Sequence, residues 1–249
     1  MIKALLFRRL WLMGHRPMMT FSFMVILPLL LHISITMVMK NILVRSLDQI
    51  PYELWIFPGI ILIIASMSTF SMIYRDLFDL RIHKKSFLPM TLAPYSKTQL
   101  ILGFLITSIV ETTLYVIVAM AVLTVFLPSP FDISTYFIIL IFTFLYTFIV
   151  GNIIITFSVV TDRISIYLSI LITMFLIILF GTGILVEFEF YPKTISVILS
   201  NFPLSMFLSS LREIIFFNRI DWFQIFIPII VAIGWTWVNG YLLKRKLNQ

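Results

Sequence analysis

Six long apolar runs constrain the fold of this chain more than any other feature. They cover residues 18–39, 54–74, 99–126, 133–160, 164–186 and 221–243, and they carry almost no charge. About 20 consecutive apolar residues suffice for a helix to cross the hydrocarbon core of a bilayer. Such a helix also satisfies its own backbone hydrogen bonds in lipid. The runs therefore predict an all-α integral membrane protein with six transmembrane helices, forming one domain over residues 1–249.

The composition excludes a soluble fold. Hydrophobic residues make up 61% of the 249-residue chain, charged residues make up 12%, and the mean hydropathy is +1.09. A soluble domain must cover its surface with polar groups, which this composition cannot supply. Six spans of about 20 residues use roughly half of the chain, and the remainder leaves no room for a separate soluble catalytic domain.

The segments between the runs differ in character. Residues 1–17 mix basic with aromatic and apolar residues, which favours an amphipathic helix at the membrane interface; a short basic flank that only sets the topology is the alternative. Residues 75–98 are polar and basic, and 128–132 and 161–163 are short connections. Residues 187–220 are interrupted by prolines and by Arg212 and Glu213, charges that would be costly in a span. We expect a helical external segment there and no seventh span.

The distribution of basic residues predicts the orientation. With six spans, one side of the membrane holds 13 of the 18 Lys and Arg residues, and the other side holds five. Cytoplasmic loops are enriched in Lys and Arg, so both termini are expected in the cytoplasm. The same rule explains the formal charge of +7 without a nucleic-acid partner, and none is expected.

No catalytic motif is present in the sequence. The chain lacks the G-x-x-x-x-G-K-[ST] motif that binds nucleotide phosphates and the H-E-x-x-H motif of zinc peptidases. It has no cysteine, and its three histidines are scattered over an expected interface helix, a span and a loop. We therefore expect no enzyme activity, no metal and no cofactor held by this chain.

Two ionisable residues fall inside the predicted spans. Glu111 lies near the middle of the third span, and His32 lies in the first. An intramembrane carboxylate is costly and is a functional candidate by default, so Glu111 is a candidate for the translocation path. The alternative for Glu111 is a role in helix packing, held by neighbouring Thr or Tyr. For His32 a neutral, hydrogen-bonded residue is the favoured interpretation.

Three segments carry a family resemblance. YRDLFDLRIHKKSFLPMTLAPYSKTQLILG (74–103) combines a charged stretch, a short apolar piece, a Pro-containing turn and a Leu-rich helix start ending in Leu-Gly. NFPLSMFLSSLREII (201–215) has a Pro-Leu-Ser pattern followed by Leu-Arg before the last span, and FPGII (57–61) opens the second span. In order and spacing these segments resemble the ABC-2 type permeases, the membrane subunits of ABC exporters, and FPGII is similar to the polysaccharide-exporting branch.

The resemblance implies a function and partners. A member of this family lies in the cell inner (plasma) membrane, pairs with a second copy of itself or a related permease, contacts membrane lipid and is powered by a cytosolic ABC ATPase dimer that binds the ATP. Its cargo would be amphiphilic or lipid-linked; a polysaccharide or glycolipid is favoured, and a hydrophobic drug or lipid is possible. A cytosolic coupling helix between spans two and three would contact the ATPase, here through Phe87, Leu88, Met90 and Leu92.

Two other classes remain open. An ion-coupled secondary transporter or a channel would need membrane-embedded charges beyond Glu111 and His32. An intramembrane assembly factor is the third class.

Overall fold

The chain is an all-α membrane protein with six candidate spans. The computed structural model describes residues 2–15, 17–46, 49–82 and 94–247. Within these ranges, six helical segments are long and apolar enough to cross a bilayer: Thr20–Met39, Tyr52–Ile82, Lys97–Thr124, Ile133–Val160, Ile164–Gly181 and Trp222–Leu247. The six predicted spans are therefore confirmed as helices.

The first two spans are each interrupted by a π-helical turn. The first consists of α2 (Pro17–Leu31), η1 (His32–Thr36) and α3 (Met37–Met39), and follows α1 (Ile2–His15). The second consists of α4 (Tyr52–Ile73), η2 (Tyr74–Asp79) and α5 (Leu80–Ile82). The last four spans are the uninterrupted helices α7 (Lys97–Thr124), α8 (Ile133–Val160), α9 (Ile164–Gly181) and α12 (Trp222–Leu247).

Two boundaries differ from the sequence prediction by five residues or more. The second span continues through residues 75–82, which were expected in a loop, because the charge of the buried Asp76 is compensated by ion pairs with Arg9 and Arg75. The fifth span ends at Gly181 and not at residue 186. There the chain leaves the helix, and Gly183 adopts a positive φ of 73°, a conformation that glycine accepts without strain.

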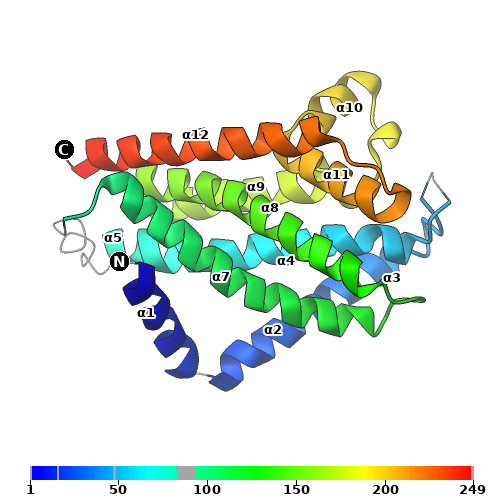
Figure 1. Cartoon of the computed structure of the whole chain (residues 1–249), viewed down its shortest axis with the longest axis horizontal. Coiled ribbons are helices and arrows are strands. Elements are labelled where there is room, and N and C mark those ends of the chain that lie inside the picture. The colour runs from blue at the N-terminus through cyan, green and yellow to red at the C-terminus, as the bar shows by residue number, and fades with distance from the viewer. Residues whose placement is uncertain (1, 16, 47–48, 83–93, 248–249) are drawn as a thin grey trace.

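The long helices form a bundle around α4 (Figure 1). The most apolar window of the second span is 83% buried, whereas those of the first and fifth spans are 28% and 22% buried. The start of α1, the end of α12 and α5 lie at one end of the bundle, on the left in Figure 1. We call this the terminal end; the end that carries α3, α10 (Lys193–Ser200) and α11 (Pro203–Phe217) is the opposite end.

The segment before the last span is helical, as expected. It comprises η3 (Phe188–Phe190), α10 and α11, and the last two are bent by 85° across a short break. Pro203 stands in the first turn of α11, where its missing N–H costs nothing. Asn218 ends α11 in the left-handed conformation, with φ of 52°.

The four proposed coupling residues belong to the part of the chain between α5 and α7 that is outside the described ranges. Residues 83–93 lie outside the described residues, and Phe87, Leu88, Met90 and Leu92 lie within this gap. The helix α1, by contrast, forms within the predicted range of residues 1–17.

At the terminal end, charged side chains join three elements. Asp162, in the turn between α8 and α9, pairs with Arg81 of α5 at 2.6 Å and with Lys246 of α12 at 2.7 Å. The hydrogen bond from Lys246, together with that from Arg81, lowers the pKa of the Asp162 carboxyl below its usual value. These pairs tie the second, fourth and sixth spans together where the chain returns to the same end of the bundle.

A polar network holds α12 against α8. Thr236 donates a hydrogen bond to the side-chain oxygen of Asn152 (3.1 Å), and the Asn239 amide donates to the backbone oxygen of Asn152 (2.9 Å). The Asn152 amide in turn donates to the carbonyl of Ala232 at 3.3 Å. Interhelical hydrogen bonds of this kind stabilise packing in lipid, where the hydrophobic effect does not hold helices together.

Close packing of α12 on α7 requires a glycine. A Cβ atom built on Gly240 would lie 2.3 Å from Oγ1 and 3.0 Å from Cα of Thr98, so the backbone itself would have to move. We predict that Gly240→Leu destabilises the folded protein by about 1–3 kcal/mol, the usual cost of overpacking. The matched control is Gly234→Leu on the same helix, where a Cβ meets no atom within 4 Å. Thermal unfolding in detergent measures both variants, and equal stability would contradict the packing.

Candidate functional site

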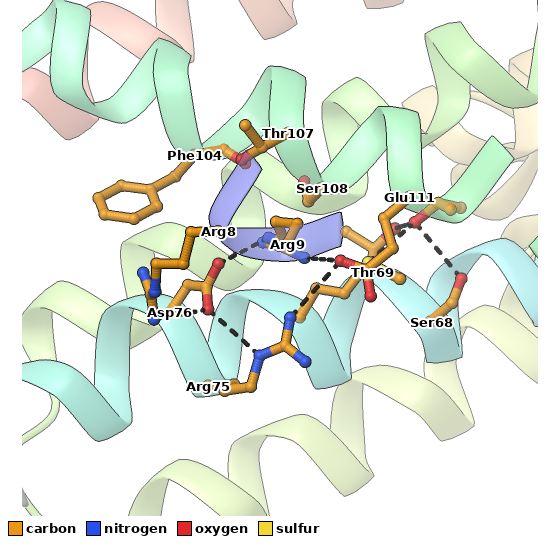
Figure 2. Close-up of polar contacts among 12 residues, drawn as sticks. Arg8, Arg9, Ser68, Thr69, Arg75, Asp76, Phe104, Thr107, Ser108 and Glu111 are labelled. Atoms are coloured by element: carbon orange, nitrogen blue, oxygen red, sulfur yellow. Dashed lines mark hydrogen bonds and ion pairs between the residues drawn. The ribbon is translucent and has the colours of Figure 1, made fainter. Parts of the chain in front are cut away.

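Glu111, the candidate from the sequence, lies in a buried cluster of charges. The cluster brings together Arg8 and Arg9 of α1, Arg75 and Asp76 of η2, and Glu111 of α7 (Figure 2). We refer to these five residues as the ion cluster. It joins the N-terminal helix to the second and third spans, which come from distant parts of the sequence.

Arg9 contacts both carboxylates of the cluster. Its Nε lies 2.7 Å from Oδ2 of Asp76, and its Nη1 donates a hydrogen bond to Oε2 of Glu111. Figure 2 shows the Arg9 side chain lying between the two acidic side chains. Because one guanidinium serves two carboxylates from two spans, Arg9 is the centre of the cluster.

The other two arginines complete the charge pairing. Arg75 lies 3.3 Å from Asp76 and 3.5 Å from Glu111, measured between nitrogen and oxygen. Arg8 reaches Asp76 at 3.4 Å. Three guanidinium groups thus face two carboxylates, a formal excess of one positive charge.

The centre of the cluster is closed to the surroundings. The side chains of Arg9 and Asp76 are each 3% exposed, and that of Glu111 is 6% exposed, whereas Arg8 and Arg75 reach the surface. Removing one partner from a buried ion pair leaves an uncompensated charge, at a cost of about 3–5 kcal/mol. The ion cluster therefore stabilises the contact between α1 and the rest of the bundle.

The neighbouring turns of α4 and α7 are also polar. Thr69 and Thr112 share a hydrogen bond of 3.0 Å between their hydroxyls, and Ser68 donates to Thr112 at 3.4 Å. Thr112 follows Glu111 in the chain, so the polar patch continues from the ion cluster along the α4–α7 contact. The π-helical turn η2 carries Arg75 and Asp76, and π turns inside helices are often found at functional sites.

The helix α1 turns Arg9 toward the protein, whereas Lys3 and His15 of the same helix are exposed. Arg9 is buried, whereas Phe7, Leu10 and Trp11 are exposed on the outer side of the helix. A helix on the membrane surface usually turns its basic residues to water. The sequence analysis therefore did not predict that Arg9 is buried in the protein. The outward apolar residues suit contact with lipid.

The cluster partners were missed in the sequence for a physical reason. Arg8 and Arg9 were assigned to a surface helix, and Arg75 and Asp76 to a polar loop, so Glu111 was left without a partner. A carboxylate near the middle of a span needs a positive charge or hydrogen-bond donors nearby. The arginines at the ends of the neighbouring predicted helices were the sequence signal for such a partner. The Thr and Tyr partners considered for Glu111 are replaced by Arg9 and Arg75 in the structure.

His32 lies elsewhere in the bundle. It is in the π-helical turn η1, is buried, and stacks on Phe126 with ring centroids 4.7 Å apart. Across the described ranges, no three or more His, Asp or Glu side chains are placed to hold a metal ion together.

Comparison of the chain with protein-family models, with curated proteins and with solved structures finds no match. The fold itself defines the class, a multi-pass helical membrane protein. The ion cluster can hold α1 against the second and third spans, and loss of one of its charges would weaken this contact.

Proposed function

We propose that this chain is the transmembrane subunit of an ATP-driven ABC exporter in the cell inner (plasma) membrane. In this proposal two copies, or this chain and a related permease, enclose a path for an amphiphilic or lipid-linked cargo, for which a polysaccharide or glycolipid is favoured. A separate cytosolic ATPase dimer supplies the energy. The chain itself carries no nucleotide-binding motif.

One observation supports this proposal above the others. The start of α1, α5, the start of α7 and the end of α12 share the terminal end of the bundle (Figure 1), and the predicted cytoplasmic side holds 13 of the 18 basic residues. An ATPase that pushed on residues 84–92 would act next to α5 and α7. The second span, which ends with α5, carries Asp76, and α7 carries Glu111, so both spans contribute to the ion cluster.

The ion cluster suggests how such a push could spread. Arg9 joins α1 to the second and third spans, which flank the proposed coupling segment. A rigid ion-paired contact would make α1 move with these two spans. In this proposal Glu111 transmits movement next to the path, and its direct contact with cargo remains a prediction.

Proton-coupled secondary transport is the second candidate, and the buried carboxylates Asp76 and Glu111 favour it. The two functions differ in their energy source. Transport into inside-out vesicles should need ATP and the partner ATPase in the first case, and only a proton gradient in the second. Transport driven by the gradient in vesicles without ATPase would overturn the exporter proposal.

The proposed topology gives a separate prediction. The chain has no cysteine, so single cysteines report sidedness cleanly. We expect Asn201→Cys, in the break between α10 and α11, to react with a membrane-impermeant maleimide in intact cells. Arg163→Cys, in the turn between α8 and α9, should react only after permeabilisation. The reverse pattern, or equal labelling of both, would contradict cytoplasmic termini.

A further inference from the structure

A cavity of about 350 Å³ lies at the opposite end of the bundle, away from the ion cluster. Its walls come from α4, from the linker that leads from α9 to η3, from η3 itself and from α11. We call it the end cavity. Nothing in the proposed transport function assigns it a role.

The charged side chains that line the end cavity are mostly acidic. They are Glu187, Glu189, Glu213 and Arg212. Among the described residues, the carboxylates of Glu189 and Glu213 make no hydrogen bond and no close ion pair, and Arg219 is a basic neighbour of Glu213. Three carboxylates outnumber the single guanidinium of the lining, so the cavity favours positive charge.

Arg212 is engaged by the backbone. Its guanidinium stacks on Trp55, 3.4 Å from the ring centroid, and donates hydrogen bonds to the carbonyls of Trp55 (3.3 Å), Gly183 (2.7 Å) and Ile184 (3.2 Å). These contacts pin the chain after α9 to α4 and α11. The arginine thus shapes the wall of the cavity, and its donors are directed at carbonyl oxygens.

Much of the remaining wall of the cavity is aromatic. Phe188, Phe216 and Phe217 line the cavity together with the carboxylates. The Phe188 ring closes over Gly183, where a Cβ would come within 2.9 Å of the ring. Aromatic faces next to carboxylates attract organic cations, through cation–π contacts and through charge.

We propose that the end cavity binds an organic cation, a quaternary or protonated amine that carries an apolar body. The carboxylates of Glu189 and Glu213 face the positive charge, and the phenylalanine rings cover the apolar part. A metal ion fits less well, because across the described residues no three acidic or histidine side chains converge as metal ligands. This proposal stands whether or not the chain is an ABC exporter.

The test is calorimetric titration of the purified protein in phosphatidylcholine nanodiscs with benzyltrimethylammonium. Its neutral carbon isostere, neopentylbenzene, serves as the ligand control. We expect saturable binding of the cation to the wild-type protein, and at least tenfold weaker binding to the double variant Glu189→Gln/Glu213→Gln. The isostere should bind at least tenfold more weakly than the cation.

Asp132→Asn is the matched control variant. Asp132 is an exposed carboxylate directly before α8, and the start of α8 lies at the opposite end of the bundle (Figure 1); the Asp132 side chain does not cap α8 and does not line the cavity. Its loss removes one negative charge from the same surface, and cation affinity should stay within twofold of wild type. The single variants Glu189→Gln and Glu213→Gln check that the fold tolerates each change. No saturable binding to wild type, equal affinity in the double variant, or equal binding of the isostere would overturn the proposal.

Discussion

Replacing Arg9 by methionine should destabilise the folded protein by about 3–5 kcal/mol, the usual cost of breaking a buried ion pair. Methionine keeps the apolar stem but removes the guanidinium that contacts Asp76 and Glu111. Among the ion pairs of the described residues, Glu111 would keep only the longer contact with Arg75, at 3.5 Å. Unfolding in detergent, followed by temperature or by denaturant, measures the loss.

A double-mutant cycle separates the ion pair from general effects of the substitution. The variant Arg9→Met/Glu111→Gln removes the carboxylate together with its partner, and should be more stable than Arg9→Met alone. Arg163→Met is the control for loss of an arginine, because Arg163 is exposed in the turn before α9. The proposed stabilising role of the ion pair between α1 and the bundle would be contradicted by either of two results. One is that the losses of stability from the two changes simply add, and the other is that Arg163→Met destabilises the protein as much as Arg9→Met.

In the proposed exporter, Phe87→Asp should abolish ATP-driven transport while the chain still inserts in the membrane. Phe87 precedes Leu88 in a basic segment between the second and third spans. Large apolar side chains among charged residues need cover from membrane or from a partner. An aspartate would be unfavourable in an apolar cleft of the ATPase, so we expect release of the ATPase or hydrolysis that no longer drives transport.

Two control variants make this prediction specific. Phe87→Leu keeps an apolar side chain and should retain most of the transport. Val125→Asp adds the same charge to an exposed position directly after α7, whose last turn lies at the opposite end (Figure 1), and should leave ATPase association unchanged. A crosslink from Leu88→Cys to the ATPase locates the contact directly. Normal transport and normal association in Phe87→Asp would refute the coupling assignment.

The spans were predictable because hydropathy depends on composition over a long window. An apolar run such as residues 133–160 satisfies its backbone hydrogen bonds in lipid by forming a helix. The helix α8 occupies this predicted range. The fifth span was predicted five residues too long, because Thr182–Val186 are as apolar as a helix interior. What ends that helix is the backbone at Gly183 and its contacts with Arg212, and these are tertiary features.

The candidate site was predictable only in part. Glu111 stood out because a carboxylate in a span is costly, but its partners are Arg9 and Arg75, which are far away in the sequence. In the sequence these charged residues looked like solvent-exposed residues at the ends of spans, because each lies next to other polar residues. A single sequence contains no direct record of which helices touch, and the pairing of Arg9 with Glu111 depends on that contact.

The most direct test of the proposed function is purification of the affinity-tagged chain from its native membranes in a mild detergent, with identification of stoichiometric partners and assay of ATP hydrolysis. The proposal predicts a soluble partner that carries the G-x-x-x-x-G-K-[ST] motif, present in equal amount, whose hydrolysis is coupled to transport after reconstitution. Loss of this partner in Phe87→Asp, but not in Phe87→Leu, would link it to the predicted coupling segment. A chain that purifies without any ATPase and transports on a proton gradient alone would contradict the account.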